Sequence, residues 1–166
     1  MHGLQITVAN QQSTLVLDRR RLAGAVRSVL RSAGFQQATV SVAVVDDRTI
    51  HDLIRRFLVH DYPTDVLSFV LEQGDGYLEG ELVVSADTAA AAAALFGWTA
   101  GDELLLYVVH GALHLVGYDD HSIRQRSAMR AEEREQLRRF GLEARYCRRP
   151  VGEKTVKKPR VLPGVG

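Results

Sequence analysis

The chain has 166 residues, of which 46% are hydrophobic and 25% are charged, a composition that fits one compact globular domain. Its single cysteine, Cys147, excludes an internal disulfide and a cysteine-based metal site. The longest apolar stretches fall short of the roughly 20 residues that a membrane span needs, and the N-terminus lacks the pattern of a secretion signal. We therefore expect a cytoplasmic protein without a membrane partner.

The net charge of +1 is unevenly distributed along the chain. Residues 145–166 contain seven basic residues and one acidic residue, so this part carries +6 and residues 1–144 carry −5. We expect one folded domain over residues 1–144 and a basic, disordered tail over residues 145–166. Such a tail either holds a phosphate backbone or only aids solubility.

The first half of the chain predicts two strands and two helices. Residues 4–8 alternate apolar and polar side chains, as a half-buried strand does. Apolar residues then recur at helical spacing over residues 22–33, before a glycine, and residues 38–45 are rich in β-branched side chains. Asp46 or Asp47 can cap the second helix, whose apolar face ends at Phe57.

The second half predicts two more strands and three helices. The strands cover residues 65–71 and 78–84, on either side of a glycine-rich turn. An alanine-rich helix follows over residues 87–96, and residues 102–115 form a helix apolar on nearly all sides, which predicts burial. A capping-box pattern at Ser122 opens a charged helix that reaches about Phe140. Strands and helices cluster rather than alternate strictly, which favours an α+β fold.

Two histidines of the buried helix form the most informative motif. His110 and His114 are four residues apart, so they share one helix face and can converge on one metal ion, as in the site helix of zinc metalloproteases. Two imidazoles in such an apolar helix need partners, which a metal would supply. An isolated HxxxH pair is usually incidental, but the apolar helix and the polar residues after it favour a metal site here.

The segment after the histidine pair offers a third ligand. Gly117 should end the helix and turn the chain, so that Asp119, Asp120 or His121 can fold back toward the pair. Three protein ligands and one open position for water are typical of catalytic zinc sites, whereas four protein ligands are typical of structural ones. The pattern therefore predicts hydrolysis by metal-activated water.

The residue after the first histidine is Gly111, whereas metallopeptidases of the H-E-x-x-H type carry their general base at this position. Metallopeptidase activity is therefore disfavoured. Either metal-bound hydroxide acts alone, or the base comes from elsewhere in the chain or from the substrate.

Three blocks of the chain resemble motifs of a known family. The segment His110-Gly-Ala-Leu-His-Leu-Val-Gly-Tyr-Asp resembles the HGxLHLxGYDH signature of the bacterial YbeY family of endoribonucleases and rRNA maturation factors. The blocks Asp61-Tyr-Pro-Thr-Asp-Val-Leu-Ser-Phe69 and Gly80-Glu-Leu-Val-Val84 are similar to that family's DxPTDVLSF and GDIxI segments. The order and spacing of the blocks match over roughly residues 5 to 142.

The resemblance implies a fold, a cofactor and a substrate. The fold would be a mixed four-stranded sheet packed with helices, and residues 1–144 would form one catalytic domain with one zinc ion held by three histidines. The activity would be cleavage of single-stranded RNA in 16S rRNA 3′-end maturation and ribosome quality control, with a ribosomal subunit or ribosomal proteins as partners. The alternative is a non-catalytic, metal-stabilised factor that binds rRNA during ribosome assembly.

Two positions depart from the family pattern. The family's third histidine falls on Asp120, with His121 one residue later, and both side-chain types bind zinc. We favour Asp120 as the third ligand on register, with His121 as its rival or as an outer group. The family's arginine before the DxPTDVLSF block falls on Leu58, so Arg55 or Arg56 would have to hold RNA phosphate in its place; both arginines also fit a solvated helix face.

Overall fold

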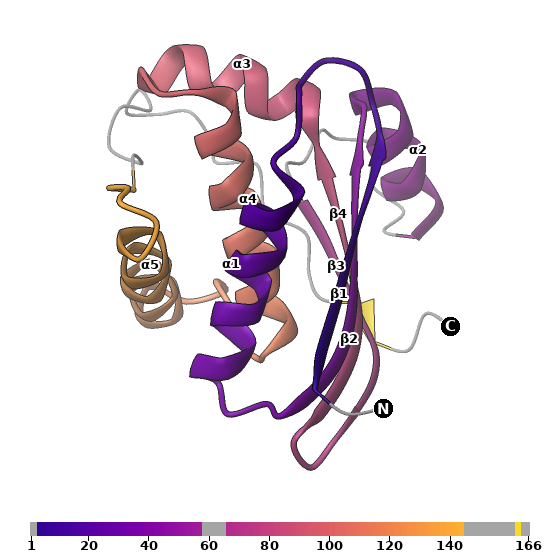
Figure 1. The fold of residues 1–166 in the computed structure, drawn as a ribbon, viewed down its shortest axis with the longest axis vertical. Helices are drawn as coiled ribbons and strands as arrows, with labels where there is room; N and C mark the ends of the chain where they lie inside the picture. Colours follow the sequence, from indigo (N-terminus) through magenta and orange to yellow (C-terminus); the bar gives the residue numbers. More distant parts are fainter. Residues whose placement is uncertain (1–2, 58–65, 145–161, 164–166) are drawn as a thin grey trace.

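The computed structural model describes residues 3–57, 66–144 and 162–163 of the chain. A mixed sheet runs through the molecule in the order β1-β2-β4-β3-β5, in which β1, β2 and β4 are parallel, β3 is antiparallel to β4, and β5 is parallel to β3 (Figure 1). The strands are β1 (Leu4–Gln11), β2 (Gln37–Val45), β3 (Val66–Gly74), β4 (Tyr77–Ser85) and the two-residue β5 (Leu162–Pro163). The four expected strands are present, and β5 adds a short piece of the tail beside β3.

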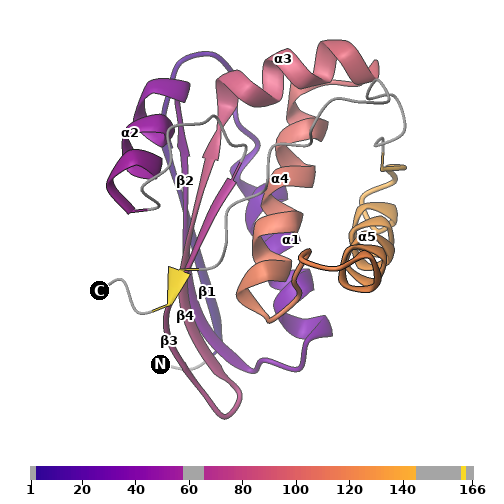
Figure 2. The same cartoon turned by 180° about the vertical axis from the view of Figure 1, so that it is seen from behind.

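Helices cover both faces of this sheet. They are α1 (Arg19–Ser32), α2 (Asp47–Phe57), α3 (Ala86–Phe96), α4 (Ala100–Leu115) and α5 (Ile123–Arg138). Figures 1 and 2 show α1 and α4 on one face with α5 outside them, while α2 lies on the opposite face. The α+β fold with a mixed sheet packed with helices is therefore confirmed.

The strand pleat explains why the two faces differ. Along β3, Val66 belongs to the large core on the α1 and α4 side, whereas the alternate residues Leu67 and Phe69 pack with Ile50 and Ile54 of α2. Because β3 is buried on both faces near its start, its first four residues are all buried, and only Ser68 among them is polar.

Helix α4 is the centre of the larger core. Every residue from Glu103 to Leu115 is buried, as its apolar sequence predicts, and the Glu103 carboxylate accepts a hydrogen bond from the Trp98 indole at 2.8 Å. The helix lies very close to the sheet at two glycines. A β-carbon at Gly80 would lie 3.0 Å from Leu115 Cδ2, and one at Gly111 would lie 2.8 Å from Val66 Cγ2. These glycines allow α4 to approach β3 and β4.

The end of α4 turns the chain back on itself. Gly117 has a φ of 109°, a left-handed conformation that favours glycine. Its amide donates to the His114 carbonyl at 3.1 Å, and the Tyr118 amide donates to the Leu113 carbonyl at 3.0 Å. The predicted turn at Gly117 is thus confirmed, and it places the following polar residues beside the last turn of α4.

No single helix among residues 3–57 and 66–144 is long and apolar enough to cross a membrane; α3 and α4 meet that test only together, and they are bent by 115° at their junction. Residues 145–161 and 164–166 lie outside the described part of the chain, so the expected disorder of the tail stays a prediction.

Candidate metal centre

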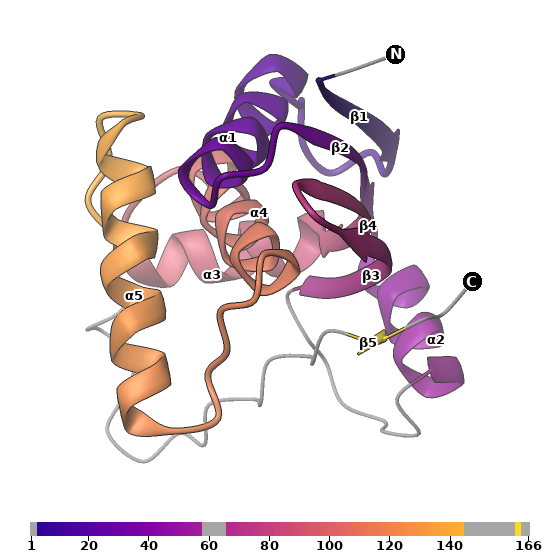
Figure 3. The same cartoon turned by 90° about the horizontal axis from the view of Figure 1, so that it is seen from below.

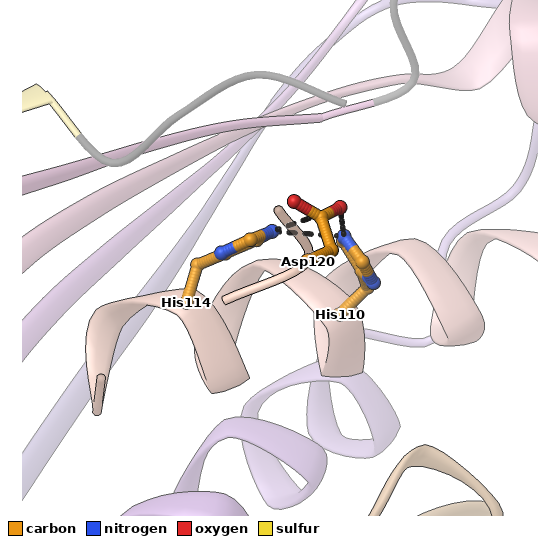
Figure 4. Close-up of side chains that lie close together, drawn as sticks. All are labelled: His110, His114 and Asp120. Carbon is orange, nitrogen blue, oxygen red and sulfur yellow. Dashed lines mark hydrogen bonds and ion pairs between the residues drawn. The ribbon is translucent and has the colours of Figure 1, made fainter. Parts of the chain in front are cut away.

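The two histidines of α4 and one aspartate of the following loop form a compact cluster (Figure 4). The Nε2 atoms of His110 and His114 are 3.0 Å apart. Asp120 Oδ2 lies 3.9 Å from the first of these nitrogens and 3.8 Å from the second. Both imidazoles are buried, while the aspartate side chain is 20% exposed, so the cluster opens to solvent on the aspartate side.

The other nitrogen of each ring is held by a hydrogen-bond acceptor. His114 Nδ1 lies 3.0 Å from the backbone carbonyl of Tyr118, which the turn at Gly117 brings back to the helix. His110 Nδ1 lies 3.0 Å from Oε2 of Glu133, a buried residue of α5. Since a carbonyl or carboxylate oxygen accepts from Nδ1–H, both rings turn Nε2 toward the cluster, as metal-ligating histidines do.

The cluster favours a bound cation. Burial, reinforced by neighbouring His110, lowers the pKa of His114 from 6.5 to about 4, so this ring is neutral at pH 7. When each ring carries its proton on Nδ1, the two Nε2 lone pairs point toward each other at 3.0 Å, and a cation bound between them would satisfy both. The nearby Asp120 carboxylate supplies negative charge on the same side.

The donor set also fits a small divalent ion. Ligand distances of about 2.0–2.1 Å in a tetrahedral site imply about 3.3 Å between ligand atoms. The three separations of 3.0, 3.8 and 3.9 Å bracket that value. Two imidazoles and one carboxylate form a ligand set found in catalytic zinc sites, which keep a fourth position for water.

Of the two rival third ligands, Asp120 lies beside the histidine pair and His121 does not. The imidazole of His121 is 49% exposed, and its Nε2 pairs with Asp119 Oδ2 at 3.1 Å. Residues 119–121 form a second group with metal-ligand spacing, but that group shares Asp120 with the histidine pair, and none of its three residues is buried. The local geometry therefore supports the register-based preference for Asp120.

The arginines suggested as phosphate ligands lie on α2, across the sheet from α4 (Figure 1). Arg55 pairs with Asp52 at 2.7 Å, and both of these side chains are about half exposed. In the part of the chain that the structure describes, no hydrogen bond or ion pair joins Arg55 or Arg56 to the histidine cluster. Leu58, the position of the family arginine, lies outside the described residues, and so do residues 61–65 of the DxPTDVLSF block.

A buried residue of that block, Ser68, helps to hold α4 against the sheet. Ser68 of β3 is 1% exposed, and its hydroxyl donates to the Gly111 carbonyl of α4 at 3.0 Å. Gly111 itself faces the sheet, where a β-carbon would meet Val66, Leu82 and Ser68. The position that carries the base in H-E-x-x-H peptidases thus has no room for a side chain here.

Glu133 is the site residue that sequence reasoning missed. It lies in a helix in which acidic and basic residues are mixed, so its composition does not distinguish it from its neighbours. The available signal was its position, because Glu133 shares a helical stripe with Met129, Gln136 and Leu137, which are all buried. A carboxylate in such a stripe needs a buried partner, and here the partner is His110.

Comparison with known proteins assigns the chain to a family. Residues 7–141 match the family model described as endoribonuclease YbeY. The chain belongs to the YbeY family. Among curated endoribonuclease YbeY proteins, the one from Rhodopirellula baltica is 45% identical over 127 residues, covering 75% of this chain and 66% of the relative. The one from Pelotomaculum thermopropionicum is 35% identical over 150 residues, covering 84% of this chain and 99% of the relative.

A solved structure resembles the fold. The solution structure of TM1509 from Thermotoga maritima aligns with a TM-score of 0.56 at 26% sequence identity, covering 83% of this chain and 91% of that one. The match includes most of the domain expected over residues 1–144, so it supports the fold of that region.

Proposed function

We propose that this protein is a metal-dependent endoribonuclease that cleaves single-stranded RNA in the cytoplasm during rRNA maturation, including 16S rRNA 3′-end processing and ribosome quality control. The observation that carries the proposal is the pair of buried imidazoles, which turn their Nε2 atoms toward each other at 3.0 Å beside a carboxylate. Membership of the YbeY family supports the reaction and the substrate class.

We assign one zinc ion to His110, His114 and Asp120. A bound zinc ion lowers the pKa of a coordinated water and offsets negative charge that develops on a phosphodiester. Glu133 and the Tyr118 carbonyl orient the two imidazoles, so the ligands need little rearrangement on binding. Asp120 in place of a third neutral imidazole leaves the loaded site one charge less positive.

The test measures zinc content and RNA cleavage in the same preparations. We expect His114→Ala and Asp120→Asn to lose stoichiometric zinc and cleavage of a single-stranded RNA, whereas His121→Gln, the matched control, keeps both. Full cleavage and full zinc content in His114→Ala would refute the proposal. A wild-type protein that zinc stabilises but that cleaves no RNA would favour the non-catalytic assembly factor instead.

A further inference from the structure

Helix α5 carries a regular row of arginines, which we call the α5 arginine row: Arg126, Arg130, Arg134 and Arg138. All four are exposed. Residues four apart on a helix are surface neighbours, and each step advances about 6 Å along the axis. The row therefore presents four guanidinium groups along about 18 Å of the helix, and it turns by about 120° around the helix axis over that length.

The row lies on the edge of α5 that faces away from α1. On the α1 side, Gln136 Nε2 donates to Ser32 Oγ at 3.0 Å, and Arg139 Nη1 donates to Ser28 Oγ at 2.9 Å. At about 100° per residue, Arg130, Arg134 and Arg138 fall on the other side of the buried stripe from these two residues. That edge is not used to hold α5 against α1.

The row begins beside the candidate metal centre. Arg126 Nη1 donates to the backbone carbonyl of Asp120 at 3.3 Å, so the first arginine contacts the loop that supplies the proposed third ligand. The same helix carries Glu133, which holds His110. Figure 3 shows the loop leading from the end of α4 directly into α5. An extended ligand bound at the metal centre can continue along the row.

The spacing of the row is unfavourable for the helix alone. Like charges at i and i+4 destabilise a helix by about 0.2–0.5 kcal/mol for each pair, and the row contains three such pairs in succession. Arg138 pairs with Glu135 of α5 at 2.8 Å, and an exposed pair of this kind contributes about 0–1 kcal/mol, so phosphate can displace it. A bound polyanion would relieve this repulsion.

We propose that the α5 arginine row binds the phosphate backbone of single-stranded RNA on its way to the metal centre. The inference rests on the proposed ribonuclease function and adds to it a binding track. Guanidinium groups bind phosphate in a bidentate manner, and contacts to the backbone alone position a strand without reading its sequence.

The test compares two triple variants that remove the same charge from different helices. The row variant combines Arg130→Gln, Arg134→Gln and Arg138→Gln. It keeps Arg126 and the contact of Arg126 with the loop that carries Asp120. The matched control is Arg19→Gln, Arg20→Gln and Arg31→Gln, three exposed positions of α1. Binding of the metal-loaded full chain to a labelled single-stranded phosphorothioate RNA of about twelve nucleotides is followed by fluorescence anisotropy at several salt concentrations.

We expect the row variant to bind the RNA at least about tenfold more weakly at low salt. Its plot of log affinity against log salt should be less steep by about 2, since each lost contact to a single strand removes about 0.7. The control should retain the wild-type slope. Wild-type binding by the row variant, an equal loss in the control, or no binding of RNA by the wild-type protein would each overturn the proposal. Cleavage of unmodified RNA by the wild-type protein is scored separately, so a chain that binds through the row but does not cleave refutes only the ribonuclease proposal.

Discussion

At the scale of single residues, the geometry of the candidate centre depends on groups outside the ligand set. An imidazole can bind a metal through either nitrogen, and its other hydrogen bond determines which one is available. Glu133 fixes this choice for His110, and the Tyr118 carbonyl fixes it for His114. The two anchors come from different segments, α5 and the turn at Gly117, so the site requires the correct packing of both.

We predict that Glu133→Gln weakens zinc binding. A neutral amide oxygen still accepts a hydrogen bond but no longer offers a charged acceptor to His110 Nδ1. Changes to such supporting residues typically cost about 10–100-fold in metal affinity. Competition with a chromophoric chelator measures the effect. Glu135→Gln, an exposed change of the same kind on the same helix, is the control and should bind zinc as the wild type does. Equal affinity in the two variants would show that Glu133 has no role in zinc binding.

At the scale of secondary-structure elements, the position of the site depends on how closely α4 lies against the sheet. Gly111 sits between the histidines and meets β3 and β4, while Ser68 donates to the carbonyl of this same glycine. These contacts fix the position of α4, and with it the position of both histidines, relative to the sheet. The histidines occupy the edge between the sheet and α5, where Glu133 reaches His110.

We predict that Gly111→Ala destabilises the fold although alanine is the better helix former. The added methyl would lie 2.8 Å from Val66 and 3.0 Å from Leu82, and such overpacking costs about 1–3 kcal/mol. Gly101→Ala is the matched control, because its nearest neighbours are 3.8 Å away and alanine should add up to about 1 kcal/mol there. Urea unfolding of both variants gives the comparison. A stabilised Gly111→Ala protein would mean that α4 can move away from the sheet at no cost.

At the scale of the whole molecule, the metal centre links three parts of the fold. Its ligands come from α4 and the loop after it, and its support comes from α5. Without a metal, the fold must keep the His114 imidazole buried and neutral. The unfolded chain has no such constraint, so the stability of the metal-free protein depends on pH.

We predict that the metal-free protein loses stability as the pH falls from about 6.5 to about 4. The pKa of His114 is lowered to about 4 in the fold, first by burial and then by His110, so in this window the unfolded state binds a proton that the folded state does not. The loss should be on the order of 2–3 kcal/mol at pH 4. Urea unfolding of chelator-treated protein at several pH values measures it.

The control for this effect is His114→Gln, in which the dependence over the same window should be much weaker. Two carboxyl groups, Asp46 and Asp102, also have shifted pKa values, but both values are lowered from 3.8 and so lie outside this pH window. Hydrogen bonds from Thr49 hold the pKa of Asp46 below 3.8. Burial raises the pKa of Asp102, but hydrogen bonds from Arg21 and Thr99 outweigh this effect, so the pKa of Asp102 is also lowered. Their contributions are lost only at lower pH. An unchanged slope in His114→Gln would place the pH dependence elsewhere.

The order of elements, the buried helix α4 and the convergence of His110 and His114 could all be predicted from the sequence, because helical and strand periodicity and the HxxxH spacing are local properties of the chain. The tertiary structure alone decided three other features. It brought Glu133 to His110 from 23 residues along the chain. It turned Asp120 toward the histidine pair while His121 paired with Asp119, and it placed Gly111 against the sheet. Each of these depends on how one element packs against another. The periodicity of α5 can indicate that Glu133 is buried, but it does not indicate which residue of another element Glu133 meets.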